Sequence, residues 1–316
     1  MPATANISQK PAAEVPFASS ALKVLLYYDL FRYPLTAAEI LYHCREQHCQ
    51  EQQLTDCLRA LQDQQYIYQQ EGFYQLKDEP HLVQRRKKGN ELARRMLQKA
   101  ADRSALIARF PYVRSVCVSG SLSKDYFDET TDIDFFIITA PGRLWVCRSL
   151  LILYKKLLLL NSKKYFCVNY FIDSESLEIP DKNIFTATEL ITLLPFYNHD
   201  LYAEFFSANQ WVMQYYPNAG LRDGHVVKAK ESLFKKGMEK LLNSAAGEWL
   251  DRYFYKTTVR HWKKKFPGLD AAEFEVNMRS RKDVSKHHPQ GFQFRVLKHY
   301  RENCEAFEAK HGISLQ

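Results

Sequence analysis

The chain has 316 residues, a formal net charge of +8 at pH 7, and 46% hydrophobic and 14% aromatic residues. This length and apolar content exclude a mainly disordered protein and allow two or three modules with their own cores. The seven cysteines lack the spacing of a small disulfide scaffold, and the N-terminus has no secretory signal core, so we expect a protein of the reducing cytoplasm.

Residues 1–19 show no apolar periodicity, and we expect them to form a disordered tail. Residues 20–79 contain helical apolar spacing in SALKVLLYYDLF, a capping-box pattern at Thr36 and Glu39, and a further apolar helical face in EQQLTDCLRALQDQQ. The alternating run YIYQQEGFYQL then indicates a β-hairpin. Three helices followed by a hairpin resemble a winged helix.

The charge of this module argues against direct reading of DNA through its third helix, the usual recognition element of such modules. Residues 19–78 contain five basic and eight acidic residues, which the phosphates of a duplex would repel. We therefore expect the module to dock a protein or to pack within the chain. DNA or RNA is a less favoured partner.

The segment HCREQHC in the same module places Cys44 and His48 four residues apart, a spacing that zinc ligands on one helix face can have. His43, Cys49 and Cys57 lie nearby, but the sequence has no second ligand pair at the usual spacing. Ordinary helix packing is the favoured interpretation of these residues.

Two basic blocks flank the centre of the chain. Residues 83–109 contain nine basic and two acidic residues, and residues 227–316 contain 19 basic and 11 acidic residues. We expect a long basic helix over residues 80–109 that connects the first module to the next. Blocks of this kind attract phosphates or nucleic acid, or are simply solvated helix faces, and the sequence leaves both readings open.

Residues 110–200 contain three strand-like runs, YVRSVCVSG, DIDFFIIT and YFCVNYFI. Between the second and the third run, residues 143–160 are apolar but are interrupted by Arg148, Lys155 and Lys156. This interruption indicates a buried helix rather than a membrane span, so we expect no membrane partner.

The remainder of the chain, residues 201–316, is expected to be mostly helical. The predicted fold class is therefore α+β, with a central mixed sheet between an N-terminal winged-helix-like module and a helical C-terminal region.

Two aspartates one residue apart, Asp132 and Asp134, stand at the entrance of the second strand. At this spacing on a strand the two carboxylates share one face, where they repel each other and are costly to bury. Mg²⁺ removes this cost, because it takes hard oxygen ligands and completes its shell with water and substrate phosphates. The pair predicts a site for two Mg²⁺ ions, or Mn²⁺ in their place.

Gly120 and Ser121 follow the first strand of the same region. Glycine allows the backbone to approach a bulky anion, and the serine hydroxyl can donate a hydrogen bond to a phosphate. Either motif alone is easily incidental. Together, with strands on both sides, they predict a site for a nucleoside triphosphate.

The apolar strand, the Gly-Ser pair, ten intervening residues and Asp-x-Asp in a second strand resemble the nucleotidyltransferase superfamily typified by DNA polymerase beta. PGRLWVCR and FCVNYFI also resemble segments of bacterial stand-alone nucleotidyltransferase-domain proteins. The resemblance covers about residues 110–190. It implies that Asp132 and Asp134 bind two Mg²⁺ and that Gly120 and Ser121 hold the triphosphate. It also implies transfer of a nucleotidyl group to an acceptor hydroxyl or other nucleophile, with release of pyrophosphate.

The superfamily has a third acidic residue on a later strand, which helps to bind the catalytic metal and to deprotonate the acceptor. The position that aligns most naturally here is Asn169, whose amide cannot accept a proton. Asp173 is our candidate for the third catalytic carboxylate, with Glu175 or Glu189 as alternatives. Without such an acid the chain would be a slow enzyme or a nucleotide-binding protein.

Two cations complete the candidate site. Arg143 stands at a helix start, where the helix dipole disfavours a cation, and Lys124 follows Ser121 by three residues. We expect both to contact the nucleotide. The sequence predicts a Mg²⁺-dependent nucleotidyltransferase with an unidentified small-molecule or protein acceptor. The alternative is a non-catalytic nucleotide-binding regulator that acts through the winged helix.

Overall fold

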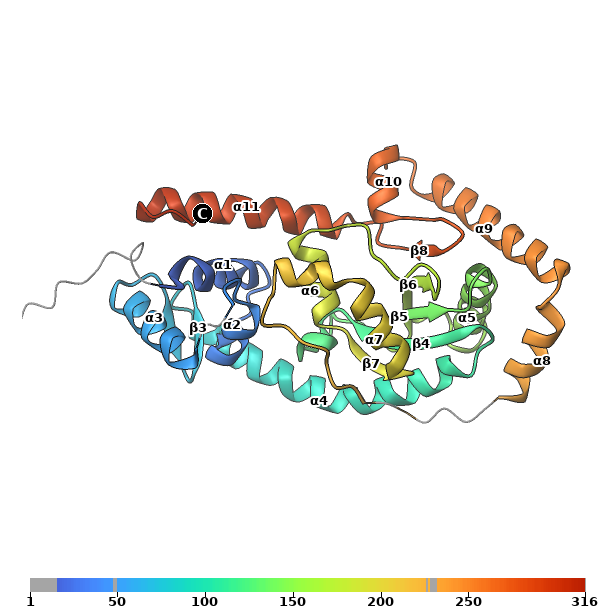
Figure 1. Cartoon of the computed structure of the whole chain (residues 1–316), viewed down its shortest axis with the longest axis horizontal. Helices are drawn as coiled ribbons and strands as arrows, with labels where there is room; N and C mark the ends of the chain where they lie inside the picture. The colour runs from blue at the N-terminus through green and yellow to red at the C-terminus, as the bar shows by residue number, and fades with distance from the viewer. Residues whose placement is uncertain (1–15, 48–49, 226, 228–231, 316) are drawn as a thin grey trace, which may run out of the picture. The chain divides into compact units, whose positions relative to one another are not determined.

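The structure is a computed structural model, and it describes residues 16–47, 50–225, 227 and 232–315 (Figure 1). Its internal contacts divide the chain into two compact units. Helices and strands occur in both units, and the second unit contains a mixed five-stranded sheet. The predicted α+β class and the mixed central sheet are therefore confirmed.

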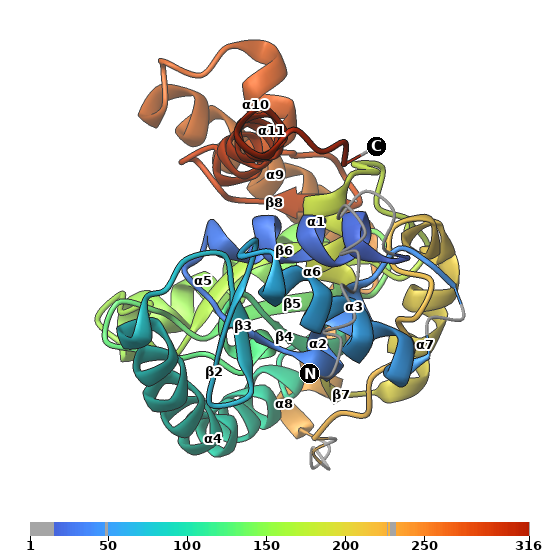
Figure 2. The ribbon, with the colours of Figure 1, turned by 90° about the vertical axis from the view of Figure 1, so that its left-hand side faces the viewer.

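The first compact unit comprises the chain up to Lys87, Met213–Ala219 and the residues from Val296 onward. Up to residue 79 its elements are α1 (Ala18–Asp29), β1 (Leu35–Thr36), α2 (Ala37–His43), α3 (Glu51–Asp63), β2 (Tyr68–Gln70) and β3 (Phe73–Gln75). β3 pairs antiparallel with both β1 and β2. The expected three helices and hairpin are thus present, and Figure 2 shows the helices beside the β2–β3 ribbon.

Local sequence signals explain where these helices begin. The backbone N–H of Thr36 donates to Glu39 Oε2 at 2.8 Å, and the backbone N–H of Glu39 donates to Thr36 Oγ1 at 3.3 Å, which confirms the capping box at the start of α2. α1 begins at Ala18, a buried residue that we had placed in the tail. The rest of that expected tail, residues 1–15, lies outside the described part of the chain.

The HCREQHC segment does not form one continuous helix face. α2 ends at His43, and Cys44 is already extended, so Cys44 does not share a helix face with the position of His48. His48 and Cys49 lie outside the described residues. The His43 ring is hydrogen-bonded to the Tyr28 hydroxyl at 2.7 Å and to the Glu39 carbonyl at 2.8 Å. Packing inside the first unit therefore accounts for His43.

The second compact unit comprises Lys88–Val212 and Gly220–Arg295. Its elements are most of α4 (Pro80–Ala108), then β4 (Val113–Ser119), β5 (Asp134–Thr139), α5 (Leu144–Leu158), β6 (Cys167–Asp173), α6 (Ile184–Ile191), β7 (Leu194–Tyr197), α7 (His199–Ala208), α8 (Leu233–Leu242), α9 (Ala245–Lys265), α10 (Ala271–Asn277), β8 (Val284–Lys286) and the start of α11 (Phe292–His311). α4 corresponds to the expected basic helix, and α5 to the expected apolar one.

The strands of the second unit are ordered β7-β4-β5-β6-β8. β5 and β6 are parallel, as the crossover through α5 requires, and the other neighbours are antiparallel. As a result, the end of β4 and the starts of β5, β6 and β7 lie at one edge of the sheet, together with the end of β8. The loops at this edge hold the polar residues discussed below.

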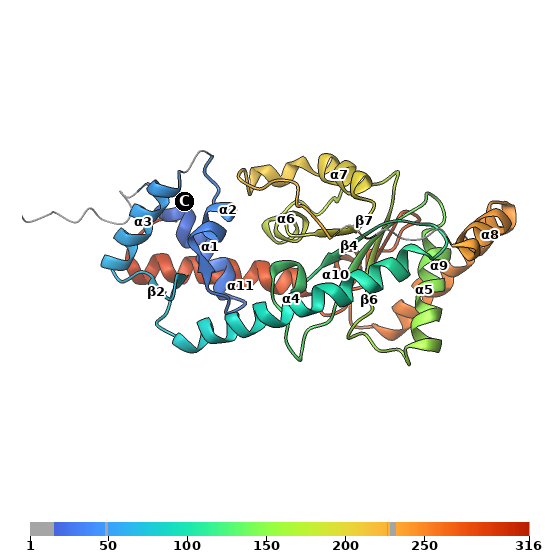
Figure 3. The same ribbon diagram turned by 90° about the horizontal axis from the view of Figure 1, so that it is seen from below.

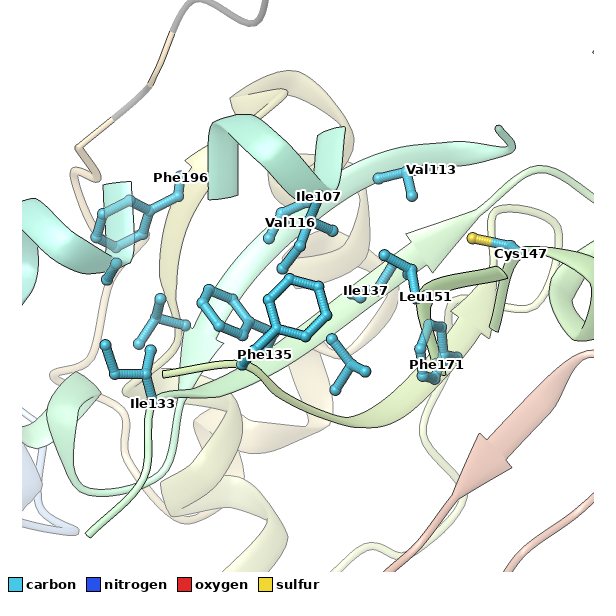
Figure 4. Packing of buried hydrophobic residues seen from close by; sticks show 14 of the residues in the cluster. Ile107, Val113, Val116, Ile133, Phe135, Ile137, Cys147, Leu151, Phe171 and Phe196 are labelled. Atoms are coloured by element: carbon cyan, nitrogen blue, oxygen red, sulfur yellow. The ribbon is translucent and has the colours of Figure 1, made fainter. Parts of the chain in front are cut away.

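Helices cover both faces of the sheet. α4 and α5 lie on one face, and α6 and α7 lie on the other (Figure 3). Alternate residues of β5 serve the two faces: Phe135 and Ile137 enter the main apolar cluster, while the Phe136 ring lies 5.1 Å from that of Phe205 in α7. Figure 4 shows the main cluster, which gathers Ile107, Val116, Cys147, Leu151 and Phe171 around β5.

Three features of this unit differ from the sequence-based expectation. β5 begins at Asp134, so Asp132 lies in the preceding loop and not on the strand. The helix expected to run through TATELITLLPFYN ends at Ile191, and the following residues form β7 as an edge strand. β8, at the opposite edge, falls in the region expected to be mostly helical. Edge strands this short give a weak periodic signal in sequence.

Across the described ranges, no helix combines the length and the apolar character needed to cross a membrane.

Candidate functional site

The sheet edge brings the two predicted motifs together. Ser119, the last residue of β4, pairs with Asp134, the first residue of β5, and Asp134 pairs in turn with Cys167, the first residue of β6. Gly120 and Ser121 follow β4 directly, and Asp132 precedes β5 by two residues. All four predicted residues, Gly120, Ser121, Asp132 and Asp134, line the same cavity.

Gly120 is the closest backbone neighbour of the Asp134 carboxylate on this side. Its φ is +68°, and a Cβ built there would lie 2.5 Å from Asp134 Oδ2. A side chain at this position would therefore be strained by the backbone conformation and would also collide with the carboxylate. The glycine leaves the carboxylate and the backbone open to a common ligand.

A bulge in β6 aims Asn169 at the same carboxylate. Val168 pairs with Phe135 and Tyr170 pairs with Phe136, so Asn169 is an extra residue in the ladder. Its Nδ2 donates to Asp134 Oδ1 at 3.0 Å. Asn169 thus lies beside the aspartate pair, at the position predicted from the sequence, and it contributes an amide there.

Burial dominates the chemistry of Asp134. Loss of solvent raises the pKa of its carboxyl to about 6, an effect that contact with Cys167 opposes. The negative charges of Asp132 and Glu189 raise the pKa further, and Lys124 acts against them. A carboxyl that is desolvated and surrounded by like charges gains from a bound cation.

Lys124 and Glu189 form an ion pair next to this cluster. Lys124 Nζ donates to Glu189 Oε2 at 3.0 Å and to the carbonyl oxygen of Gly120 at 3.1 Å. Lys124 therefore lies beside Gly120, as expected for a nucleotide contact, but its ammonium already holds a carboxylate. Glu189, an alternative for the third acid, reaches the cavity from α6 and has this cation as its partner.

Asp173 is not brought to the site, which corrects its assignment as the third catalytic carboxylate. It pairs with Thr139 at the far end of β5, whereas Asp134 occupies the near end. Its Oδ1 accepts a hydrogen bond from the backbone N–H of Glu175 at 3.0 Å. The strand continues straight to Asp173 rather than bending back, so neither Asp173 nor Glu175 lines the cavity.

Arg143 is also placed elsewhere, which corrects its assignment as a nucleotide contact. It is the N-cap residue of α5, and α5 begins at the sheet edge opposite to Asp134. Its guanidinium donates to the carbonyls of Leu242, at 3.2 Å, and Gly142, at 2.9 Å. Arg143 joins the start of α5 to the end of α8 and does not line the cavity.

The cavity at this edge has a volume of about 1130 Å³, enough for a nucleotide and a second substrate. Its acidic lining comes from Asp132, Asp134, Asp181 and Glu189. Its basic and imidazole lining comes from α5, α9 and the segment after β8, and comprises Arg148, Lys155, Lys156, Lys163, Lys265, Lys286, His261, His287 and His288. Acidic residues thus lie at the sheet edge, and most cations lie to one side of it.

Two of these cations are buried without a charged partner. Arg148 and Lys155, on α5, are each 8% exposed, and in the described chain neither side chain forms a hydrogen bond or an ion pair. Burial lowers the pKa of Arg148 to about 10 and lowers the pKa of Lys155. The Arg148 guanidinium carbon lies 4.6 Å from the centre of the Trp262 ring, in α9.

Two histidines after β8 lie between these cations and Asn169. The backbone N–H of His287 donates to the Asn169 carbonyl at 3.0 Å. Burial and then the charge of Arg148 lower the pKa of His287 to about 3, and burial with Lys286 lowers the pKa of His288 to about 4. Both imidazoles are therefore neutral at pH 7, and the wall near Arg148 carries its charge on arginine and lysine.

Sequence reasoning missed Lys155, His287 and His288 as site residues. Lys155 interrupts an otherwise apolar helix, a signal that we had used only to argue against a membrane span. The histidines follow a strand of three residues, and their approach to Asn169 depends on pairing between β6 and β8. No local pattern indicates that long-range pairing.

Within the described residues, no three His, Cys, Asp or Glu side chains form a group that could hold a metal ion by themselves. Mg²⁺ rarely needs such a cage, because one or two carboxylates with substrate phosphates and water usually suffice. Asp132 and Asp134 supply carboxylate oxygens of this kind, and Gly120 leaves the space beside Asp134 Oδ2 free of a side chain. The residues present therefore fit Mg²⁺ held jointly with a phosphate ligand.

Comparison of the chain with models of known families, with curated proteins and with solved structures found no match.

Proposed function

We propose that the protein is a nucleotidyltransferase that uses Mg²⁺ to transfer a nucleoside monophosphate from an NTP to an acceptor, with release of pyrophosphate. The observation that carries the proposal is the convergence of Gly120–Ser121, Asp132 and Asp134 at one sheet edge, inside a cavity with basic walls. This convergence agrees with the resemblance of the motifs to the DNA polymerase beta-type superfamily. The order α1-β1-α2-α3-β2-β3 likewise supports a winged helix in the first unit.

In the proposed reaction, a nucleophilic atom of the acceptor attacks the α-phosphorus of the NTP. A new bond forms to the α-phosphorus, and the bond to the bridging oxygen breaks, so that pyrophosphate leaves with the electron pair. Asp132 and Asp134 would hold the metal, and Gly120 and Ser121 would receive the β- and γ-phosphates. Mg²⁺ bound there supplies positive charge to the reacting and leaving phosphates.

The chain's own residues set two features of this chemistry. The ion pair of Lys124 with Glu189 fixes the Gly120 carbonyl, and therefore the turn that faces the phosphates. Asn169 orients the Asp134 carboxylate through its amide but cannot take a proton from the acceptor. The acceptor's proton, where it has one, therefore passes to water or to another base.

A second candidate function follows from Asn169. An amide in place of a third carboxylate suits a protein that binds a nucleotide without turnover and regulates a partner through the first unit. This candidate predicts binding of Mg²⁺·NTP with no release of pyrophosphate. The two functions share the same site and differ only in the chemical step.

The proposal is tested by incubating the purified protein with each of the four NTPs and Mg²⁺, with and without cell extract as a source of acceptor, and measuring pyrophosphate release. We expect release with at least one NTP, only with Mg²⁺ or Mn²⁺, and a loss of about 10³-fold in Asp134→Asn, because the metal is no longer held in place. Asp200→Asn, a carboxylate in the first turn of α7, is the matched control and should keep the wild-type rate. Equal rates in the wild type and Asp134→Asn would rule out this site as the source of activity.

A further inference from the structure

The cavity contains two buried cations that the chain itself does not neutralise. Arg148 and Lys155 are more than nine-tenths buried and line the cavity, yet among the described residues neither side chain has a carboxylate partner. An unpaired charge out of water is costly, and proteins normally pair it or expose it. An anion that belongs to a ligand is the partner that would remove this cost.

Other buried cations of the same unit show the usual solution. Lys286 is 5% exposed, and its Nζ donates to Gln293 Oε1 at 2.9 Å and lies 3.4 Å from Asp181 Oδ2. Arg279 is equally buried and donates to both oxygens of Asp181. The chain therefore supplies carboxylates and amides to buried cations a short distance away, and it supplies none to Arg148 or Lys155.

The two unpaired cations lie on the opposite lateral side of the aspartates from the Gly-Ser turn. Gly120 and Ser121 follow β4, on one side of β5. Lys155 lies close enough to Cys167, at the start of β6 on the other side, for each to shift the pKa of the other. Arg148 has the same relation to His287, which follows β8, one strand further along the sheet.

We propose that Arg148 and Lys155 bind a phosphate group of the acceptor, so that the second substrate is a phosphorylated molecule. This inference rests on the proposed function, in which Gly120 and Ser121 hold the triphosphate. The attacking and leaving groups of phosphoryl-type transfer lie roughly in line through the α-phosphorus. With pyrophosphate leaving toward β4, the acceptor enters from the side of β6 and β8, where the two free cations lie.

The geometry of the two side chains suits a phosphate. They are seven residues apart, which is two helical turns or about 10 Å along α5, so their long side chains approach a group between them from both ends. Arg148 rests against Trp262 and Trp145, with 4.6 and 5.7 Å to the ring centres, and this contact fixes its plane without using its N–H donors. A fixed guanidinium fork is well matched to phosphate oxygens.

A phosphorylated acceptor also explains how the site works with Asn169. An attacking phosphate oxygen is already ionised at neutral pH and carries no proton that a third carboxylate would need to remove. Its oxygen forms the new bond to the α-phosphorus as the bridging oxygen leaves with pyrophosphate. The amide that is unsuitable for a hydroxyl acceptor is then no disadvantage.

The test is calorimetric titration of inorganic phosphate into the full-length protein that has been saturated with Mg²⁺ and an ATP analogue with a methylene group between its α- and β-phosphates. We expect phosphate to bind in the presence of the analogue, and to bind at least about tenfold more weakly to Arg148→Gln and to Lys155→Gln, each of which loses a charge-assisted contact. Affinity for the analogue should be unchanged in both variants. Lys256→Gln, which removes an exposed lysine of α9 outside the cavity, is the matched control.

Several outcomes would overturn the inference. Phosphate that competes with the analogue, together with weaker analogue binding in the two variants, assigns the cations to the triphosphate instead of the acceptor. No binding of phosphate at tens of millimolar, or equal binding in wild type and both variants, removes the site altogether. Circular dichroism and melting temperature identify a variant that fails to fold, and the other variant then decides the result.

Failure of the proposed function gives a different pattern. If the analogue does not bind, the nucleotide site is wrong, and the titration of phosphate alone still compares wild type with Arg148→Gln and Lys155→Gln. Asp134→Asn separates the two sites further, because it should weaken analogue binding and leave phosphate binding unchanged.

Discussion

Two buried arginines of this protein, one in each compact unit, have opposite surroundings. Arg86, in the first unit, is 4% exposed, donates to the Pro34 carbonyl and to Glu39 Oε1, and lies over the Tyr33 ring. Arg148, in the second unit, is 8% exposed and has aromatic neighbours but no acceptor. A buried cation with its acceptors in place belongs to the fold, whereas one without them belongs to a site that a ligand completes.

The largest expected effect compares the same substitution at the two positions. Arg86→Met leaves Glu39 without its cation, and we expect the free energy of unfolding to fall by about 3 kcal/mol. Arg148→Met removes a charge that has no partner and keeps an apolar stem against Trp262, so we expect no loss and a gain of up to about 1 kcal/mol. Urea unfolding of both variants in phosphate-free buffer measures the difference.

A destabilisation of Arg148→Met similar to that of Arg86→Met would break this comparison, since it would mean that Arg148 is held by the fold. Arg94→Met, at an exposed position of α4, controls for the generic effect of replacing arginine by methionine and should change stability little.

A smaller effect concerns Asp251, a buried carboxyl that accepts a hydrogen bond from the backbone N–H of Val146 at 2.9 Å. Burial raises its pKa to about 6, above the ordinary value of 3.8. Because the folded pKa is raised, the native state binds the proton more tightly, and stability from this group declines as pH rises from about 4 to about 6. Asp251→Asn should therefore be more favourable relative to wild type at pH 7.5 than at pH 4, by about 1–2 kcal/mol.

Urea unfolding of wild type and Asp251→Asn at the two pH values checks this prediction. The same difference at both pH values would show that Asp251 is ionised throughout and that its backbone contact outweighs burial. Asp200→Asn, in the first turn of α7, is a suitable control.

Much of the fold could be predicted because its signals are local. The apolar spacing of α1 and α3, the capping box of Thr36 and Glu39, and the hairpin β2–β3 all lie within short segments. The same holds for Gly120–Ser121 and Asp132–Asp134, which two paired strands bring together. Such patterns are set by chain geometry over a few residues.

The remainder of the site depends on contacts between distant segments. Asp173 was the natural acidic candidate on β6, but only the register of β5 with β6 shows that it stands at the wrong end of the strand. Asn169 reaches Asp134 because of a bulge, which one strand alone does not reveal. Arg148 and Lys155 read as interruptions of an apolar helix until the cavity beside them is known.

Mg²⁺-dependent nucleotide binding at the sheet edge tests the account most directly. Calorimetric titration of the methylene ATP analogue into wild type and Asp134→Asn, each with Mg²⁺ and with EDTA, measures it without requiring an acceptor. The account predicts binding by wild type only with Mg²⁺, and at least about tenfold weaker binding by Asp134→Asn. Binding that is indifferent to Mg²⁺, or equal in the two proteins, would contradict it.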